Sequence, residues 1–590
     1  MNWKDAMTLE GRIDSDRRRL MRAMALGGTA AGLGLWKAPA WALATQTNPD
    51  GILAGNRFDL EIGQTPLRIG GQAGNAVTVN GTLPAPILRW REGEEVTLRV
   101  RNALAQTSSI HWHGILLPAN MDGVPGLSFH GIAPGGDYLY RFKVKQNGTY
   151  WYHSHSSLQE QAGLYGALII DPAQPEPFQY ERDYVILLSD WTGMDPYKLF
   201  ARLKKRPDYD NLYKRTVGDF FQDVRERGLS ATLADRKAWG EMRMSPTDLA
   251  DVNGNTYAYL ANGRTHDDAW TGLFSPGERI RLRFVNAAAM SFFDVRIPGL
   301  KFTVVAADGQ HVQPVEVEEF RIAPAETYDV IVQPTDDAAY SVFAQSMDRS
   351  GYALATLAPR PGMRAAVPVL DKRAILTMED MGHGSHDMSG SGEMSCGASM
   401  EGGCGASMGH DMGAMAMQEH PASETRNPDV DMQTMMPSPR LDDPGIGLRG
   451  NGRDVLLLSK LRSLHAPADD REPSRTIELH LTGNMERFTW GFDGIKFSDA
   501  EPVQLKYGEL VRFVLVNDTM MEHPVHLHGM WSDIEDEHGK FLVRKHTVSI
   551  PPGTRRSFRV TADALGRWAF HCHMLMHMEA GMMREVRVDE

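Results

Sequence analysis

The segment His-Cys-His-Met-Leu-Met-His-Met-Glu-Ala-Gly-Met occupies residues 571–582, close to the end of a chain of 590 residues. If it is a strand that runs into a loop, neighbouring side chains point to opposite faces, so His571 and His573 face away from Cys572. An electron-transfer copper is held by a thiolate, two imidazoles and a weak thioether. The chain offers this set as Cys572, His577, Met582 and the upstream His523. The histidines beside Cys572 would then serve a second site, joined to the first by a short covalent path.

Histidine pairs of the same kind recur in three other places. They are residues 111–113 (His-Trp-His), 153–155 (His-Ser-His) and 526–528 (His-Leu-His). A His-x-His pair on a strand places both imidazoles on one face, and neutral imidazole suits copper. A single pair is weak evidence, but four pairs shared between two distant parts of the chain predict one metal cluster built from both parts.

A weak internal repeat divides the chain. Residues 93–102, 277–286 and 508–517 each begin with a turn glycine, continue as an alternating apolar strand and end in asparagine. Short strands punctuated by Gly and Pro, three times over, predict an all-β chain of three β-sandwich domains. The later strands of the first and third repeats lead into histidine pairs, whereas residues 340–346 of the second contain no metal ligand. The middle domain is therefore predicted to be structural.

The composition narrows the classes of function. The net charge of -13 disfavours a nucleic-acid-binding protein and favours cationic partners. Three cysteines cannot make a disulfide framework, whereas 32 methionines and 21 histidines supply soft and imidazole ligands. Ligands of these two kinds in such numbers indicate copper.

The N-terminus has the features of an export signal. Adjacent arginines at residues 17–19 precede a short, glycine-rich apolar run over 23–35 and an Ala-Trp-Ala site at 40–42. This order resembles a twin-arginine signal and predicts that residues 1–42 are removed on export, with an ordinary secretory signal or a membrane anchor as the alternative. No later segment approaches the length of a membrane span, so the mature chain is expected to be soluble and periplasmic.

Two insertions interrupt the β pattern. Residues 196–249 combine many charges with apolar residues at helical spacing, which predicts a mostly helical insertion in the second domain. Residues 378–436 consist chiefly of Met, Gly, Ser, His and Asp, so this Met-rich insertion is expected to be disordered without metal. Its candidate ligands for accessory Cu(I) are Met394, Cys396, Met400, Cys404, Met408, His410 and Met412. The two cysteines could instead form a disulfide, and the whole insertion could be an inert linker.

The four histidine motifs together resemble those of the three-domain multicopper oxidases, the laccase-like family, from about Phe58 to the end of the chain. The resemblance implies three cupredoxin-like Greek-key β-sandwich domains, at about residues 50–172, 173–362 and 438–590, with a linker over 363–437. It also implies four coppers per chain, three of them in a cluster between the first and third domains. One copper would take an electron from the substrate, and the other three would reduce O2 to water.

The resemblance assigns each ligand to a copper. The type 1 copper would be bound by His523, Cys572, His577 and Met582. The type 2 copper would be bound by His111 and His526. The type 3 pair would be bound by His113, His153, His155, His528, His571 and His573. An error of one residue in register would choose Met583 in place of Met582.

Three features resemble one branch of the family, the bacterial copper-resistance oxidases of the copper resistance protein A group. These are the Met-rich insertion, the twin-arginine signal and the stretches at residues 478–483 and 530–533. The resemblance implies oxidation of Cu(I) to the less membrane-permeant Cu(II), with O2 as acceptor and excess copper bound by the insertion. A periplasmic copper chaperone is an expected partner. The alternatives are a laccase-type oxidase with a phenolic electron donor, and a copper-sequestering storage protein with a vestigial oxidase site.

Proton delivery to the cluster is assigned to Asp122, which matches an acidic residue that many family members carry there. A carboxylate near the cluster could deliver protons at a tuned pKa. A turn aspartate before Gly123 explains the same residue equally well from the sequence. Met578, followed by Glu579, stands where several bacterial members carry a second acid, which puts that second proton route in doubt.

Overall fold

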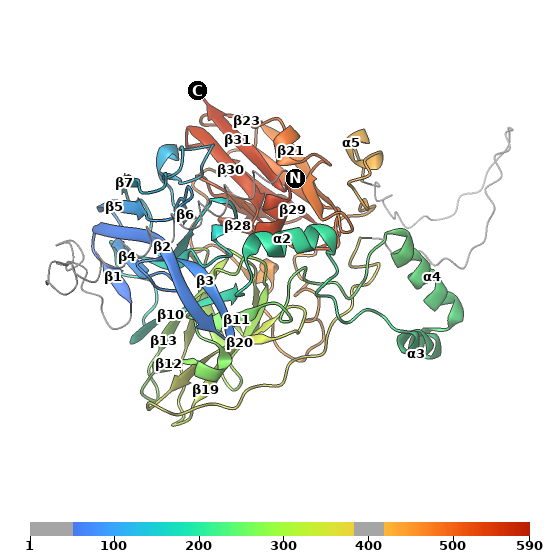
Figure 1. Ribbon diagram of the computed structural model, residues 1–590, viewed down its shortest axis with the longest axis horizontal. Coiled ribbons are helices and arrows are strands. Elements are labelled where there is room, and N and C mark those ends of the chain that lie inside the picture. Colours follow the sequence, from blue (N-terminus) through green and yellow to red (C-terminus); the bar gives the residue numbers. More distant parts are fainter. Residues whose placement is uncertain (1–50, 383–417) are drawn as a thin grey trace, which may run out of the picture. The chain divides into compact units, whose positions relative to one another are not determined.

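Six β-sheets are present in the part of the chain that the structure describes, residues 51–382 and 418–590, and Figure 1 shows them in a computed structural model. The chain divides into two units, residues 1–53 and 54–590. Strand β1 (Ile52–Ala54) lies at their boundary, and the helices and strands named below belong to the second unit. The predicted export signal and the accessory ligands from Met394 to Met412 lie outside the described residues.

The first domain contains two sheets of short strands. In spatial order, one sheet has β4 (Ile87–Arg91), β9 (Tyr165–Asp171), β8 (Gly148–His153) and β6 (His111–His113). The other has β3 (Gln72–Val79), β2 (Arg57–Ile69), β5 (Glu95–Asn102) and β7 (Asp137–Lys143). Burial along β5 alternates because one face of its sheet meets the core and the other meets water. Strand β8 is buried at every position and carries His153 at its end.

The middle domain is built from two larger sheets. One has β11 (Ala258–Ala261), β10 (Arg182–Trp191), β13 (Ile280–Asn286), β18 (Thr327–Val332), β15 (Phe302–Ala307) and β16 (Gln310–Val317). The other has β12 (Trp270–Leu273), β20 (Tyr352–Ala358), β19 (Tyr340–Ser346), β14 (Phe293–Arg296) and β17 (Glu319–Ile322). Strand β13 is buried throughout, as expected for a strand covered on both faces.

The third domain repeats this plan. One sheet has β22 (Thr489–Phe492), β21 (Arg475–Asn484), β24 (Leu510–Asn517), β29 (Arg555–Thr561), β26 (Ser532–Glu535) and β27 (Phe541–Lys545). The other has β23 (Val503–Lys506), β31 (Met583–Asp589), β30 (Gly566–Cys572), β25 (His523–Leu527) and β28 (Thr547–Ile550). A short helix, α6 (Leu575–Glu579), separates β30 from β31.

The three domains share one topology, which confirms the predicted all-β fold of three cupredoxin-like sandwiches. In each domain a parallel pair lies next to the edge strand of one sheet: β2 with β5, β10 with β13, and β21 with β24. A second parallel pair, β4 with β9, β12 with β20, and β23 with β31, lies in the other sheet.

The asparagine that ends each sequence repeat makes the same hydrogen bonds in all three domains. The Nδ2 of Asn102 donates to the carbonyls of Gln106 and Ile132, at 2.8 Å each. The Nδ2 of Asn286 donates to the carbonyls of Ser291 and Ile322. The Nδ2 of Asn517 donates to those of Met521 and Ile550. Each side chain is buried and satisfies backbone acceptors that the loop would otherwise leave without partners. The repeat in the sequence thus reflects one loop closure used three times.

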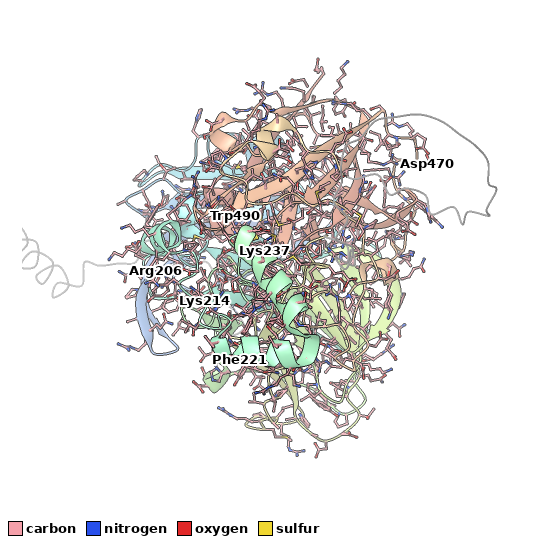
Figure 2. The ribbon with its side chains drawn as sticks, turned by 90° about the vertical axis from the view of Figure 1, so that its right-hand side faces the viewer. Arg206, Lys214, Phe221, Lys237, Asp470 and Trp490 are labelled. Atoms are coloured by element: carbon pink, nitrogen blue, oxygen red, sulfur yellow. The ribbon has the colours of Figure 1, made fainter. Side chains whose placement is uncertain are left out.

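The predicted helical insertion is confirmed. It contains α2 (Pro196–Lys205), α3 (Val217–Arg227) and α4 (Leu229–Glu241). Helix α2 buries two leucines against the core, whereas α3 buries none of its side chains. In Figure 1, α3 and α4 project from the sheets, and Figure 2 labels Phe221 on α3 and Lys237 on α4.

Both ends of the Met-rich insertion are folded. Met381 and Met432 are buried in the core, and α5 (Ala422–Thr425) lies between residue 418 and Met432. The expected disorder therefore does not extend to residues 378–382 or 418–436, because these ends bury apolar side chains. Residues 383–417 lie outside the described part of the chain.

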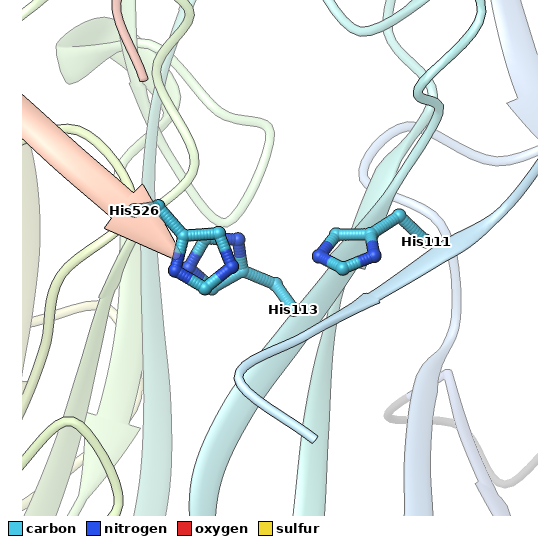
Figure 3. Close-up of side chains that lie close together, drawn as sticks. All are labelled: His111, His113 and His526. Carbon is cyan, nitrogen blue, oxygen red and sulfur yellow. The ribbon is translucent and has the colours of Figure 1, made fainter. Parts of the chain in front are cut away.

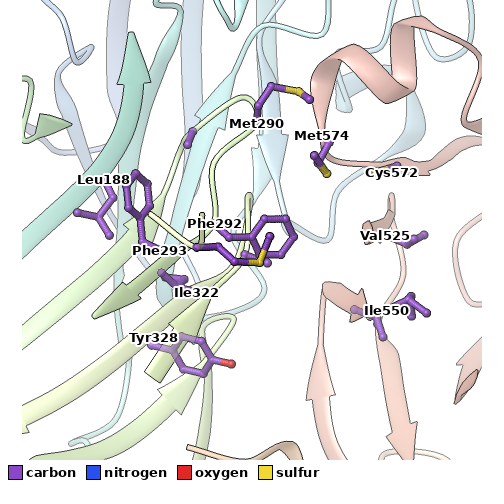
Figure 4. Close-up of a cluster of buried hydrophobic side chains, with 14 of the residues drawn as sticks. Leu188, Met290, Phe292, Phe293, Ile322, Tyr328, Val525, Ile550, Cys572 and Met574 are labelled. Atoms are coloured by element: carbon purple, nitrogen blue, oxygen red, sulfur yellow. The ribbon is translucent and has the colours of Figure 1, made fainter. Parts of the chain in front are cut away.

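The cores of the middle and third domains are continuous, as Figure 4 shows around Phe292, Met290 and Met574. The amide of Leu575 donates to the carbonyl of Ala289 at 2.9 Å, and the amide of Met576 points at the sulfur of Met290 at 3.4 Å. The loop after β13 therefore supports α6. Among the described residues, no helix combines the length and hydropathy that crossing a membrane needs.

Candidate metal centre

Cys572, the last residue of β30, lies beside two imidazoles. Its Sγ is 3.4 Å from Nδ1 of His523 and 3.9 Å from Nδ1 of His577. The two nitrogen atoms are 3.2 Å from each other, and all three side chains are buried. The chain after Cys572 forms α6 rather than the loop expected from the sequence, and α6 carries His577. A thiol and two imidazoles therefore surround one point, which fits an electron-transfer copper.

The two methionines that follow α6 lie in different parts of the core. The backbone of Met582 bonds to that of Cys572 and His577, at 3.1 and 3.0 Å. Met582 is buried in the cluster that contains Cys572, whereas Met583 packs with Val124 and Ala569. This arrangement favours Met582 as the thioether nearer the thiol.

Eight further histidines, four from each of the first and third domains, come together in three groups. In each group the ligand atoms lie within 4.8 Å of one another. The groups are His111, His113 and His526; His113, His153 and His573; and His155, His528 and His571. Figure 3 shows the first group, with the rings of His113 and His526 stacked at 3.8 Å. The last two groups contain the six histidines that the resemblance assigns to the type 3 pair.

Oxygen atoms hold the Nδ1 atoms of five of these rings. The acceptors are the carbonyl of Asp122 for His111, the carbonyl of Ser154 for His153, the carbonyl of His546 for His526, the Asp122 carboxylate for His528 and the carbonyl of Cys572 for His571. A Glu160 oxygen also lies 2.6 Å from His153 Nδ1. A proton fixed on Nδ1 leaves a lone pair on Nε2, which is how metal-binding histidines are usually oriented. Within the described residues, the buried Nε2 atoms of His111, His153, His526 and His573 have no hydrogen-bond partner. These four nitrogen atoms are therefore available to bind metal, which fits a cluster of copper ions.

Seven of the eight imidazoles have a lowered pKa. Burial, with the neighbouring imidazoles, holds the pKa of His113, His153, His155, His526, His528 and His573 well below 6.5. Burial likewise lowers the pKa of His571 to about 4. Because neutral imidazole is the metal-binding form, the rings can accept copper without first losing a proton.

Asp122 joins the two halves of the cluster. Its carboxylate Oδ2 accepts a hydrogen bond from His528 at 2.8 Å, and its own carbonyl accepts one from His111 at 2.7 Å. The side chain is 1% exposed. Gly123 next to it has a φ of 86°, and a Cβ there would lie 1.9 Å from the carbonyl oxygen of Ile110. Asp122 is thus both a turn residue before glycine and a buried acid beside the histidines.

Sequence reasoning missed three residues around the two sites. Asp251 of the middle domain accepts a hydrogen bond from Nε2 of His577 at 2.7 Å. Glu160 lies 2.6 Å from His153, and burial raises its pKa well above 4.5. The Nδ1 of His546 lies 3.2 Å from the Nε2 of His113. None of the three belongs to a motif, and only the acidic character of the first two could have drawn attention to them.

Comparisons with known proteins cover most of the chain. Three family models described as multicopper oxidase match residues 61–175, 182–361 and 470–590. The copper resistance protein A homolog of Pseudomonas syringae pv. tomato is 62% identical and covers 98% of this chain and 99% of its own. Copper resistance protein A of Escherichia coli is 61% identical over 98% and 100%. The crystal structure of Fet3p, a multicopper oxidase that functions in iron import, superposes with a TM-score of 0.63 at 19% identity, covering 91% of each chain.

Proposed function

This chain belongs to the multicopper oxidase family, and on that premise we propose that it is a copper-resistance oxidase that oxidises Cu(I) to Cu(II) and passes the electrons to O2, which is reduced to water. Four coppers per chain would carry this reaction. The one-electron chemistry comes from the coppers when bound, and the protein holds their ligands, excludes water and supplies protons. The carboxylate of Asp251 on His577 is the observation that favours a metal cation as the electron donor.

Four side chains would hold the type 1 copper: His523, Cys572, His577 and Met582. Their packing supports this role, because the thiol and both imidazoles are buried and Trp490 stacks on His577 at 4.0 Å. Asp251 fixes the ring proton of His577 on Nε2, so the Nδ1 lone pair points at Cys572. The type 2 copper would take His111 and His526. The type 3 pair would take His113, His153, His155, His528, His571 and His573.

A cavity of about 520 Å³ supports Cu(I) as substrate. It lies between the helical insertion and the middle domain, and its lining includes six carboxylates and three arginines. Asp248 lines the cavity. Burial, and then the like charge of nearby Asp251, raise the pKa of Asp248 well above 3.8. Asp223 and Asp235 of the lining are paired with arginines. A cation that enters this cavity would lower the repulsion at Asp248, which favours Cu(I) over a neutral phenol.

Steady-state oxidation of Cu(I) and of a phenol by the copper-loaded protein tests the proposal. Cu(I) oxidation should be saturable and coupled to O2 consumption. In a variant that lacks residues 383–417, kcat/KM for Cu(I) should fall while the phenol rate stays unchanged. A phenol rate that is indifferent to added copper, with no saturable Cu(I) oxidation, would rule out the cuprous oxidase and favour a laccase-type enzyme.

Asp122, beside His528, is the proposed proton donor to the cluster, and Glu160, beside His153, is a second acid. An Asp122→Asn variant keeps an oxygen that can accept from His528 but loses the exchangeable proton. Its kcat should fall about tenfold, less than the loss of a sole acid, because Glu160 remains. The blue absorption should not change, since Asp122 makes no contact with Cys572 in the described residues. Copper analysis of the variant is the control, and an unaltered kcat at full copper content would remove Asp122 from proton delivery.

The cellular setting is part of the same proposal. The arginine pair and apolar run before residue 42 support export by the twin-arginine pathway to the periplasm. The methionines and the cysteines at 396 and 404 would bind additional Cu(I), because thioethers and thiolates prefer the reduced ion. A periplasmic copper chaperone would exchange copper with the protein.

A further inference from the structure

A cluster of potential metal ligands lies in the third domain outside the oxidase site. It consists of His420, Glu424, His480 and Asp518, whose ligand atoms all lie within 4.8 Å of one another. Glu424 is on α5, His480 is on β21, and Asp518 directly follows β24. Glu424 and Asp518 are 1% and 0% exposed, so two carboxylates are buried side by side.

The Nδ1 atom of each imidazole faces the carboxylates. His480 Nδ1 is 2.7 Å from Asp518 Oδ2 and 3.4 Å from Glu424 Oε2. His420 Nδ1 is 3.0 Å from the same Glu424 oxygen and 3.4 Å from the same Asp518 oxygen. Four ligand atoms thus surround one small space.

The other nitrogen of each ring faces a second oxygen. Nε2 of His420 is 3.0 Å from the carbonyl of Thr434, which can only accept a hydrogen bond. Nε2 of His480 is 3.3 Å from Glu478 Oε1. Both Nε2 atoms therefore carry protons, and a neutral ring would point its Nδ1 lone pair at a carboxylate oxygen. Such a contact is repulsive unless a cation, either a proton on each ring or a metal ion, lies between the atoms.

The carboxylates keep acceptor capacity for that cation. In the part of the chain that the structure describes, the buried Oε1 of Glu424 has no hydrogen-bond partner. No lysine or arginine among those residues forms an ion pair with Glu424 or Asp518. The amide of Thr434 donates to Asp518 Oδ1 at 2.7 Å and so turns Oδ2 towards the two rings.

We infer that His420, Glu424, His480 and Asp518 form a binding site for a divalent transition-metal ion. Two imidazoles and two carboxylates suit Cu(II) and Zn(II), with Cu(II) held more tightly, and offer no thioether or thiolate for Cu(I). The outer hydrogen bonds from both Nε2 atoms are those that orient metal-binding histidines. This inference does not depend on the oxidase reaction.

In the sequence, the site follows the Met-rich residues 383–417 and precedes the proposed type 1 ligands. His420 comes three positions after the Met-rich residues 383–417 in the sequence. Asp518 precedes Thr519, whose hydroxyl lies 2.7 Å from Nε2 of His523, beside Cys572. Thr519 and His523 would therefore connect a metal ion at the site to the Cys572 thiol.

Without a metal, the cluster holds protons instead. Burial lowers the pKa of both imidazoles, but hydrogen bonds to carboxylates outweigh it. Asp518 and Glu424 raise the pKa of His420 to about 9. Asp518 and Glu478 raise the pKa of His480 to about 10. Among the described residues, Glu478 and Asp493 are further charged groups beside His480, and Arg555 lies 3.9 Å from Glu478. A metal ion must displace these protons, so its uptake at pH 7 should release about two protons per ion.

Titration of the copper-loaded, full-length protein with Zn(II) tests the inference. Zn(II) is redox-inert, so it reports binding without turnover. The unaltered protein should bind one more equivalent of Zn(II) than a His480→Ala variant. Binding of that equivalent should raise the midpoint temperature of thermal unfolding. Glu424→Gln, which keeps the shape of the side chain, should weaken the same step by at least about 100-fold. Retained blue absorption in both variants shows that the third domain is folded.

Two matched variants separate this site from other histidines. His538→Ala, whose ring is 81% exposed, should bind Zn(II) as the unaltered protein does. A variant with His383, His386 and His410 replaced by Ala should also keep the extra equivalent. With Cu(II) as the probe, the nitrogen couplings in the electron paramagnetic resonance spectrum of that equivalent should indicate two imidazoles. Equal stoichiometry in the unaltered protein and in His480→Ala would overturn the inference and leave a proton-bridged ion pair.

Discussion

A Cys572→Ser variant is expected to lose the blue absorption and to oxidise Cu(I) about 10³-fold more slowly than the unaltered protein, or worse. The Sγ of Cys572 belongs to the proposed type 1 site and lies 3.4 and 3.9 Å from its two imidazoles. A serine hydroxyl has nearly the same shape but does not ionise at neutral pH and is a poor copper ligand. Burial raises the pKa of the Cys572 thiol, so the thiol keeps its proton until a metal displaces it.

The same substitution at Cys396 and Cys404 is the matched control, and it should leave the blue absorption intact. Copper analysis should find about three coppers in Cys572→Ser, because the eight cluster histidines do not depend on the thiol. Copper tolerance of cells that carry the variant separates the two main hypotheses. An oxidase predicts loss of tolerance, whereas a storage protein predicts that tolerance is unchanged.

The alternation of side chains along a strand is the reason that the grouping of the histidines and Cys572 could be predicted from the sequence. Along β30, His571 meets His155 and His528, while the next residue, Cys572, meets His523 from the other direction. Side chains alternate between the two faces of a strand, which determines the direction of both residues. The same rule applies wherever one strand lies between two sites. The asparagine that ends each sequence repeat was equally informative about the three domains, because it makes the same pattern of hydrogen bonds in each of them.

Contacts of single polar residues that lie outside the motifs could not be predicted in this way. Asp251 and His577 are 326 positions apart, and Asp251 lies in a loop without periodicity. Its position depends on how the helical insertion returns to the core and on how the middle domain packs against α6. Glu160 and His546 are similar, since each is a single polar residue whose partner comes from packing. The cluster around His480 has four members from three separate segments, and no local pattern connects them.

The middle domain consequently does more than hold the outer domains. It contains none of the predicted metal ligands, as the sequence indicated. Yet Asp190, which is buried, accepts hydrogen bonds from the amides of Ala289 and Met290, and the carbonyl of Ala289 in turn accepts from Leu575 on α6. This series of bonds positions the helix that carries His577. The carboxylate on the outer nitrogen of His577 comes from the same domain.

An Asp251→Asn variant is expected to lower kcat/KM for Cu(I) about 100-fold while changing the rate with an organic donor only a few-fold. The amide can still accept the hydrogen bond from His577 Nε2, so the ring keeps its orientation. What it lacks is the negative charge, which makes the imidazole a stronger donor to copper and attracts the cationic substrate. The type 1 reduction potential should therefore rise as the Cu(I) activity falls.

A matched control and two donors make this result decisive. Asp267→Asn removes the same charge from a side chain that is 83% exposed, and it should leave both rates unchanged. Steady-state kinetics with Cu(I) and with a neutral phenol then separate recognition of the cation from the structure of the copper site. If both donors slow down equally in Asp251→Asn, the carboxylate acts only by positioning His577. If neither does, the middle domain has no part in electron transfer, and the cavity beside Asp248 is not where Cu(I) binds.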